Sequence, residues 1–385
     1  MAIPPELQQL IAQAKEQMPQ LGHLPDEVVA QLILQAMQEQ QAEPPTSDEE
    51  LKNMHPEQLG AIGERMMNQG RWDEAEKYFF QALENAERIN DIGQQAKAAN
   101  VLGRLCRDRG DFPQATILYQ QALTLAERIG DRRLMGVICD QMGSAYRMQG
   151  GYPQAIEYYK KSLEIMEQRG EEQALAAIHG NLGTVYRRQG DYERATQAYK
   201  KGLELNIKLG DDRGAAAKYS NLGLVYEEQG RYDQAIEMYQ QSLEIFQHLG
   251  DQRNAAYVYS YLGSVHYLLG NYEAALQMYQ KALEIMRRIG DEPAVAQVYG
   301  NLANVYQEIG DVGQALAYYH KALKIFERIS DRHNAANTYF NLGYLYRQQG
   351  DVAQARAHFE KAKALFEMVG DAQRAQRAVQ ALRGL

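Results

Sequence analysis

The stretch that decides the fold is residues 171–210, EEQALAAIHGNLGTVYRRQG followed by DYERATQAYKKGLELNIKLG. Its first half places Ile178, Leu182 and further apolar residues at helical spacing, which gives one apolar face over about four turns. Gly190 and Asp191 then follow, and such a pair ends one helix in the left-handed conformation and caps the next. The second half repeats the helical pattern and stops at another glycine. The stretch therefore predicts two antiparallel helices.

The same unit recurs along the chain with a fixed length. The glycine between its two halves returns at intervals of 40 residues, at Gly70, Gly110, Gly150, Gly190, Gly230, Gly270, Gly310 and Gly350. A globular core does not require equal spacing, because its elements differ in length, whereas a stack of identical helix pairs does. No stretch alternates apolar and polar residues with period two, so strands are not expected. The sequence predicts an all-α fold, an α-solenoid.

Small and aromatic residues indicate how the helices touch. The middle of the first helix is small in successive units: Gly103, Gly143, Gly183, Gly223, Gly263, Ala303 and Gly343. A glycine there costs up to about 1 kcal/mol relative to alanine. We expect close approach of the second helix to compensate, at Ala115, Ala155, Ala195, Ala235, Ala275, Ala315 and Ala355. The aromatic residues at fixed positions, such as Tyr186 and Tyr199, are predicted to fill the core beside these contacts.

The repeated pattern resembles the tetratricopeptide repeat family. Its signature in the fourth repeat is carried by Leu182, Gly183, Tyr186, Gly190, Ala195 and Tyr199. The family's third small residue of the second helix is Gly202 here, and the resemblance covers about residues 51–385. The 40-residue unit, with Asn-Leu-Gly in the first helix and Gly-Asp between units, resembles the subclass of LGN/Pins adaptors and kinesin light chains. This resemblance implies a right-handed superhelix of antiparallel helix pairs.

The chain is expected to contain three parts. Residues 1–50 hold two amphipathic helices and a polar linker, and residues 51–370 hold eight repeats, the first with a leading helix shortened by Pro56. Residues 371–385 begin a ninth first helix, with Arg383 where the close-packing glycine would stand, so we expect a C-terminal capping helix with a solvated outer face. The N-terminal helices are expected to cap the front of the array. The alternatives are that they fold into the groove or form a homodimer.

Composition limits the class of protein. The net charge of −9 and the pI near 5.5 argue against a general nucleic-acid binder, which would be basic. No signal peptide is recognisable, and no apolar run reaches the roughly 18–20 residues that span a bilayer. Cys106 and Cys139 lie at apolar-face positions and are predicted to be buried thiols rather than a disulfide or redox pair. We therefore expect a cytoplasmic protein with no membrane insertion.

Catalytic motifs are not found. The eight histidines fall at different repeat positions, with no HExxH and no paired spacing for a metal. Phosphate-binding glycine loops and nucleophile motifs are also missing. The sequence therefore predicts no enzyme activity and no metal or cofactor.

The resemblance to tetratricopeptide repeats implies a peptide-binding groove lined by the first helices. Carried over position by position, the front half of the groove has the basic or amide residues Lys97, Asn100, Arg104, Arg107, Arg147, Arg187 and Arg188. Further along the chain, the groove positions hold Tyr257, Tyr261, Tyr267, Tyr344 and Arg347. Guanidinium groups match carboxylates, and tyrosines offer broad apolar contact with a polar tip. The alternative for the arginines is that they favour the C-terminal end of their helix dipole.

Asparagines form a second set of candidates. Asn181, Asn221, Asn301 and Asn341 occupy one repeat position, and Asn304 lies one turn beyond Asn301. An amide offers both a donor and an acceptor, so it can hold a peptide backbone whatever its side chains. The alternative is a hydrogen bond between helices of neighbouring repeats.

These observations favour a non-catalytic adaptor or scaffold that binds an extended, partly acidic peptide of a partner protein in the groove. The alternative is a kinesin-light-chain-like linker to cargo or cytoskeleton, which predicts a long heptad segment for a motor partner. The N-terminal 41 residues are too short and too rich in proline to supply one. A sensor of a signalling peptide is the third hypothesis, and no output domain for it is recognisable.

Overall fold

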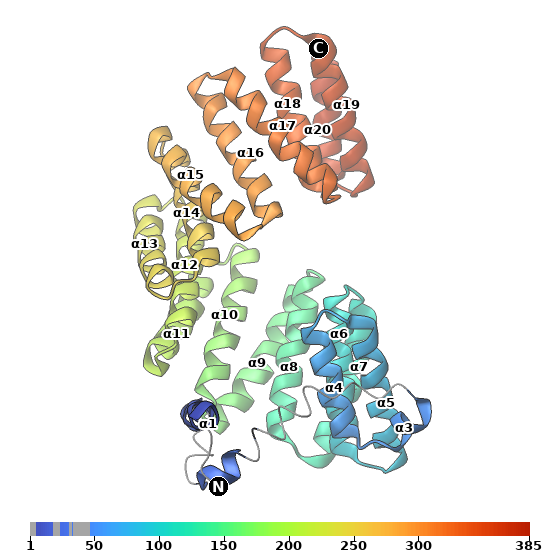
Figure 1. The fold of residues 1–385 in the computed structure, drawn as a ribbon. Helices are drawn as coiled ribbons and strands as arrows, with labels where there is room; N and C mark the ends of the chain where they lie inside the picture. The colour runs from blue at the N-terminus through green and yellow to red at the C-terminus, as the bar shows by residue number, and fades with distance from the viewer. Residues whose placement is uncertain (1–4, 18–23, 31–32, 34–46) are drawn as a thin grey trace. The chain divides into compact units, whose positions relative to one another are not determined.

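The computed structural model describes residues 5–17, 24–30, 33 and 47–385, and over these residues it contains helices and no strands. The chain forms two compact units, residues 1–134 (unit 1) and 135–385 (unit 2), each described by itself. Consecutive helices pack as antiparallel pairs within each unit (Figure 1). The all-α solenoid predicted from the sequence is confirmed.

The helices of the repeats have nearly equal lengths, as the 40-residue period requires. Unit 1 contains α1 (Pro5–Gln17), α3 (Asp48–Asn53), α4 (Pro56–Asn68), α5 (Trp72–Arg88), α6 (Ile92–Asp108) and α7 (Phe112–Ile129). Unit 2 contains α8 (Arg132–Met148), which begins just before it, α9 (Tyr152–Arg169), α10 (Glu172–Arg188), α11 (Tyr192–Leu209), α12 (Asp212–Glu228), α13 (Tyr232–His248), α14 (Gln252–Leu268), α15 (Tyr272–Ile289), α16 (Glu292–Ile309), α17 (Val312–Arg328), α18 (Arg332–Gln348), α19 (Val352–Met368) and α20 (Ala372–Arg383).

The turns between helices follow the Gly-Asp pattern. Gly190 has φ +76°, a left-handed conformation that favours glycine, and the Asp191 carboxylate then accepts a hydrogen bond from the backbone N–H of Arg194 at 3.0 Å. Gly210 and Asp211 repeat this arrangement at the end of α11. The predicted helix ends of the fourth repeat are therefore confirmed.

The mid-helix glycines lie against an aromatic ring of the second helix. A Cβ atom added to Gly183 would lie 2.7 Å from the ring of Tyr199, and the equivalent glycines meet the equivalent aromatic ring in the same way. The second helix therefore approaches the first closely, as predicted, and its aromatic ring is the group nearest to the glycine. Ala195 of the second helix is fully buried. The tyrosine ring lies so close to Gly183 that a Cβ atom at this position would clash with it. The prediction that these aromatic residues belong to the core is confirmed, because Tyr199 is fully buried too.

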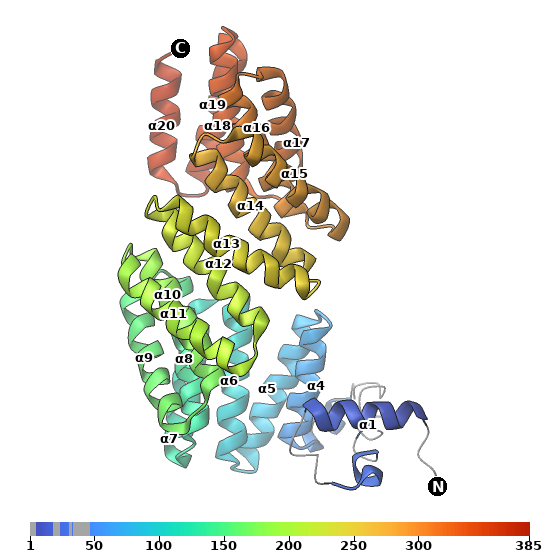
Figure 2. The ribbon, with the colours of Figure 1, turned by 90° about the vertical axis from the view of Figure 1, so that its left-hand side faces the viewer.

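The ends of the described chain agree with part of the prediction. In α1, Ile11 is buried against Val29 and Ala30, so the first N-terminal helix is amphipathic. The rest of the predicted second helix and of the linker lies largely outside the described residues. Pro56 is the first residue of α4 and separates it from the short α3, as predicted. At the other end α20 packs on α19 (Figure 2) and buries Ala378 and Ala381.

The remaining global predictions concern cysteines and membranes. Cys106 and Cys139 are both buried free thiols. Among the described helices, none combines the length and apolar character that crossing a membrane requires.

Candidate functional site

The first helices of successive repeats contact one another directly. In unit 2, α10 packs on α12, α12 on α14, and α14 on α16, and in unit 1 α4 packs on α6. We use the term first-helix face for the surface that the predicted groove residues form on these helices. Each unit carries its own part of this face.

In unit 1 the first-helix face lies on α6. Lys97 is exposed, whereas Arg104 is half-buried, with its guanidinium 3.7 Å from the Glu64 carboxylate of α4. Arg107 forms an ion pair with Asp108 at 2.7 Å. The Asn100 Oδ1 and Arg104 Nε atoms are buried without a hydrogen-bond partner in the described protein. Carboxylates therefore offset much of the predicted positive charge here.

In unit 2 the three predicted arginines have different environments. Arg187 is only 12% exposed and forms an ion pair with Glu228 of α12. Arg188, beside it, is exposed. Arg147 is half-buried on α8, and no carboxylate in the described part of the chain forms an ion pair with it. The charge of Arg187 is therefore paired within the protein, whereas Arg147 and Arg188 form no ion pair among the described residues.

The fully buried tyrosines of the second helices place their hydroxyl groups beneath the first-helix face. Tyr159 hydrogen-bonds Ser144 and Tyr199 hydrogen-bonds Thr184, both at 3.0 Å. Burial raises the pKa of Tyr159, although the Arg147 guanidinium beside it acts in the opposite direction. The sequence predicted these tyrosines only as core. The sequence analysis did not predict the hydrogen bonds of their hydroxyl groups. Ser144 and Thr184, which occupy the same repeat position in two first helices, were a signal for these bonds.

Glu227 is an acidic residue of a first helix that also hydrogen-bonds a buried tyrosine of the second helix. It accepts a hydrogen bond from the Tyr239 hydroxyl at 2.7 Å, and burial raises the pKa of its carboxyl group. Tyr261 stacks on the Tyr239 ring with centroids 5.4 Å apart. This part of the face therefore carries an aromatic pair next to a buried carboxylate.

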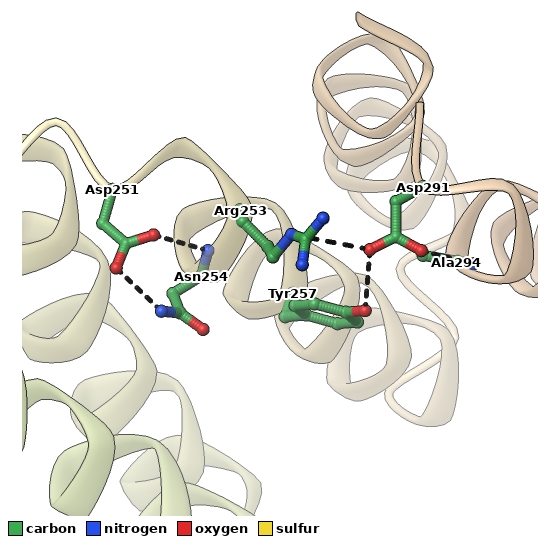
Figure 3. Close-up of polar contacts among 6 residues, drawn as sticks. All are labelled: Asp251, Arg253, Asn254, Tyr257, Asp291 and Ala294. Carbon is green, nitrogen blue, oxygen red and sulfur yellow. Dashed lines mark hydrogen bonds and ion pairs between the residues drawn. The ribbon is translucent and has the colours of Figure 1, made fainter. Parts of the chain in front are cut away.

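The other predicted tyrosines make contacts within the protein. Tyr257 donates a hydrogen bond to the Asp291 carboxylate at 3.1 Å, and Arg253 lies 3.8 Å from the same carboxylate (Figure 3). Asp291 also caps α16 at the N–H of Ala294. Tyr267 packs at a tilt on Tyr272 with centroids 6.0 Å apart. Tyr257 thus links two neighbouring repeats and keeps its ring partly exposed.

The asparagines divide between the two interpretations. Asn181 donates a hydrogen bond to the Asp140 carboxylate at 3.0 Å. This bond links neighbouring repeats, as the alternative interpretation of the asparagines expects. Asn304 accepts from the Tyr319 hydroxyl, and Asn301 accepts a long 3.4 Å bond from Gln297. Asn341 lies beside Tyr319 and lowers its pKa, against the larger effect of burial, which raises it. No hydrogen bond of the Asn221 side chain is found within the described residues, so its amide is the most open to a ligand.

A recess at the end of unit 2 contains residues that the sequence analysis missed. This recess is a cavity of about 240 Å³, lined by Asn337, Phe340, Asn341, Phe366, Arg374 and Arg377. Arg374 donates to His333 Nε2 at 2.6 Å and lies 3.3 Å from Asp371. The Arg377 guanidinium lies over the Phe340 ring, 5.6 Å from its centroid. The sequence contained a signal for two of these residues, because Asn337 and Arg377 occupy the same repeat position as Tyr257, which was predicted to line the groove.

Two predicted residues lie just beyond this recess. Tyr344 packs edge-on against Phe359, and the Arg347 guanidinium covers the Tyr344 ring at 4.6 Å. Arg347 is exposed. Together with the recess, these residues give α18 and α20 a cationic and aromatic surface.

Comparison with known proteins identifies the repeat. A family model described as tetratricopeptide repeat matches residues 59–128, 137–208, 214–288 and 294–368. No curated protein matches the sequence significantly.

Solved structures with a similar fold come from several kinds of protein. BtubC (BKLC) from P. vanneervenii is 26% identical, over 57% of this chain and 92% of that chain, with a TM-score of 0.52. Aspartyl phosphate phosphatase F from Bacillus subtilis is 14% identical over 95% of both chains, with a TM-score of 0.60. A signal transduction ATPase with a tetratricopeptide repeat sensor from Pyrococcus horikoshii is 18% identical, over 96% of this chain and 54% of that chain, with a TM-score of 0.64. The last two show similarity of fold alone.

Proposed function

The chain belongs to the tetratricopeptide repeat family, a family of protein-interaction scaffolds, and from this premise we propose that it binds an extended, partly acidic peptide of a partner protein along its first-helix face. The protein acts as a non-catalytic adaptor. The arginines would contact acidic side chains, Asn221 would hold the peptide backbone, and the half-buried tyrosines would pack against apolar side chains.

The observation that carries the proposal is the environment of Arg147. Arg147 is half-buried and lies beside the Tyr159 hydroxyl, with which it hydrogen-bonds. Its Nε atom is buried without a partner in the described protein, as are those of Arg104 and Arg187, but Arg147 differs from these two because no carboxylate among the described residues forms an ion pair with it. An unsatisfied buried donor costs about 1–3 kcal/mol, and more when it is charged. Because the residue as a whole is only half-buried, a carboxylate from a ligand would pair with the accessible part of the guanidinium through a charge-assisted hydrogen bond, which is stronger than a neutral one.

The recess between α18 and α20 supports the same chemistry at the other end of unit 2. Two guanidinium groups and two amides line a cavity of about 240 Å³ beside two phenylalanine rings. Arg377 has no carboxylate partner within the described residues. Such a recess suits an acidic side chain followed by an apolar one.

A peptide library tests this proposal with the full chain. Random 12-residue peptides displayed on phage are selected on the wild type, and the affinity of the enriched peptides is measured by fluorescence anisotropy. We expect peptides rich in aspartate and glutamate, and a loss of affinity of at least about 100-fold in the double variant Arg147→Glu, Arg188→Glu, because two charges that no carboxylate pairs within the described residues become repulsive to the peptide.

The control is the double variant Lys200→Glu, Arg287→Glu, which makes the same change in net charge at exposed positions of second helices. It is expected to retain affinity within about threefold, since distant exposed charges are screened. Equal losses in both double variants, or unchanged affinity in the first, would contradict the proposed site. Enriched peptides that match cargo or cytoskeletal proteins would instead favour the kinesin-light-chain-like linker.

A further inference from the structure

A lysine replaces a core residue in one first helix of unit 2. The seventh residue after the N-cap is buried in the other first helices of the unit, with an exposed fraction of 5% or less at Ile138, Ile178, Val258, Val298, Thr338 and Ala378. In α12 this residue is Lys218, which is half-buried. Removing an ammonium group from water is unfavourable unless a partner compensates. The position therefore needs an explanation other than packing.

Two glycines make room for this lysine. A Cβ atom on Gly180 of α10 would lie 2.8 Å from Lys218 Cε and 2.9 Å from Nζ, and one on Gly202 of α11 would lie 2.9 Å from Cε. The other second helices of unit 2 have serine or alanine at the position of Gly202, namely Ser162, Ser242, Ala282, Ala322 and Ala362. The lysine and the two glycines thus form one arrangement that interrupts the repeat at a single place.

The ammonium group has no partner within unit 2. No hydrogen bond or ion pair of Lys218 is found among the described residues, and burial lowers the pKa of its amine, with Asp211 acting weakly in the other direction. Asp211 is already engaged, because one of its oxygens accepts from the N–H of Gly214 at 2.8 Å and the other from Asn206 at 2.6 Å. The nearby carboxylate is therefore committed to capping α12.

The end of the lysine lies beside α10, the helix that carries several predicted groove residues. Gly180 directly precedes Asn181 and lies seven residues before Arg187, which is two helical turns on the same side of α10. The side chain starts on α12 and lies beside Gly180 of α10 and Gly202 of α11. A group that binds there would meet the lysine together with the neighbouring arginine.

We propose that Lys218 is a binding residue for a carboxylate of the bound peptide, which enters between α10 and α12 over Gly180. This assignment rests on the proposed function and names a residue for it. The carboxylate supplies the charge partner that the protein lacks at this place, so part of the stability lost by placing a lysine here is recovered only in the complex.

The test uses an acetylated and amidated hexaglutamate peptide, with hexaglutamine as the uncharged control. Binding to the full chain is measured by isothermal titration calorimetry, and Tm by circular dichroism. Lys218→Met keeps the length of the side chain and removes the charge. We expect it to weaken hexaglutamate binding about tenfold or more and to raise Tm, because an apolar side chain fits this environment better. Lys200→Met, at an exposed position of α11, is expected to change neither quantity appreciably.

Gly180→Ala provides a second variant that keeps the amine. Its methyl group would occupy the place of Lys218 Cε, so we expect a similar loss of hexaglutamate binding. If Lys218→Met binds hexaglutamate within twofold of the wild type while Arg147→Glu, Arg188→Glu abolishes binding, the Lys218 assignment alone is wrong. If the wild type binds hexaglutamate no better than hexaglutamine, both the assignment and the acidic ligand are wrong. If Lys218→Met does not fold, the Gly180→Ala result decides.

Discussion

Gly183 shows how one missing methyl group sets the distance between two helices. Its α carbon faces the Tyr199 ring, where an added Cβ would lie 2.7 Å from the ring atoms. Gly300 also lies inside a helix, but nothing lies within 4 Å of an added Cβ there. The two glycines therefore separate the cost of crowding from the intrinsic preference of a helix for alanine.

We predict opposite effects for alanine at these two positions. Gly183→Ala gains up to about 1 kcal/mol of helix propensity but loses about 1–3 kcal/mol by overpacking, so we expect a net destabilisation of about 1–2 kcal/mol. Gly300→Ala has only the gain and is expected to stabilise the protein by up to about 1 kcal/mol. Urea unfolding followed by circular dichroism measures both. A stabilising Gly183→Ala would show that the tyrosine ring moves aside freely.

At this scale the sequence predicted which residues are small but not what they touch. The small residue in the middle of each first helix, glycine in all repeats but the one with Ala303, predicts close approach of the second helix, but it does not show which side chain makes the nearest contact. The structure identifies the tyrosine ring, because a flat ring can lie against the backbone where a branched side chain cannot. Lys218 was not recognised either, although it occupies a repeat position that holds isoleucine or valine in the two repeats on either side. The two glycines that make room for it are apparent only in the structure.

The helices themselves depend on their caps, and these caps differ along the chain. Asp191 accepts a hydrogen bond from the N–H of Arg194 at the start of α11. Asn271 occupies the equivalent position before α15 but makes no side-chain capping bond. The same residue position therefore supports one helix start through its side chain and the other without it.

We expect this difference to appear in stability. Asp191→Ala removes a cap and should destabilise unit 2 by about 1 kcal/mol, whereas Asn271→Ala should cost clearly less. The ion pair between Asp191 and Arg194 is exposed and adds little to this difference. Urea titrations of both variants give the comparison, and amide hydrogen exchange in the first turn of α11 shows whether the loss is local. Equal destabilisation by the two substitutions would contradict the role of the aspartate cap.

Contacts between elements explain why the candidate site was predicted only in part. The repeat positions placed Arg147, Arg187 and Tyr257 on the first helices, as the structure has them. Their partners come from the next repeat: Glu228 lies 41 residues after Arg187, and Asp291 lies 34 residues after Tyr257. Which neighbouring carboxylate reaches which side chain depends on helix packing and rotamers, so the charge left open on the face could not be read from sequence.

In the molecule as a whole, stability is distributed along an array of repeats. Each helix pair packs mainly on its neighbours, so the free energy of unfolding is approximately a sum of repeat terms and nearest-neighbour terms. The chain has one tryptophan, Trp72, which opens α5 in unit 1 and is 40% exposed. Its fluorescence therefore reports on the first repeat, whereas circular dichroism at 222 nm reports on all helices.

We predict that these two signals separate when the fourth repeat is weakened. Gly183→Ala should lower the urea midpoint seen by circular dichroism, while the midpoint seen by Trp72 fluorescence should move less than half as much, because Gly183 and Trp72 lie in repeats that share no neighbour. Gly63→Ala serves as the matched variant, since its Cβ would meet the Phe79 ring at 2.7 Å in the repeat that contains Trp72. In Gly63→Ala, the urea midpoint seen by Trp72 fluorescence should move at least as far as the midpoint seen by circular dichroism. Coincident shifts of both signals in both variants would mean that the whole chain unfolds as a single cooperative unit, and would contradict the separate unfolding of the first and fourth repeats.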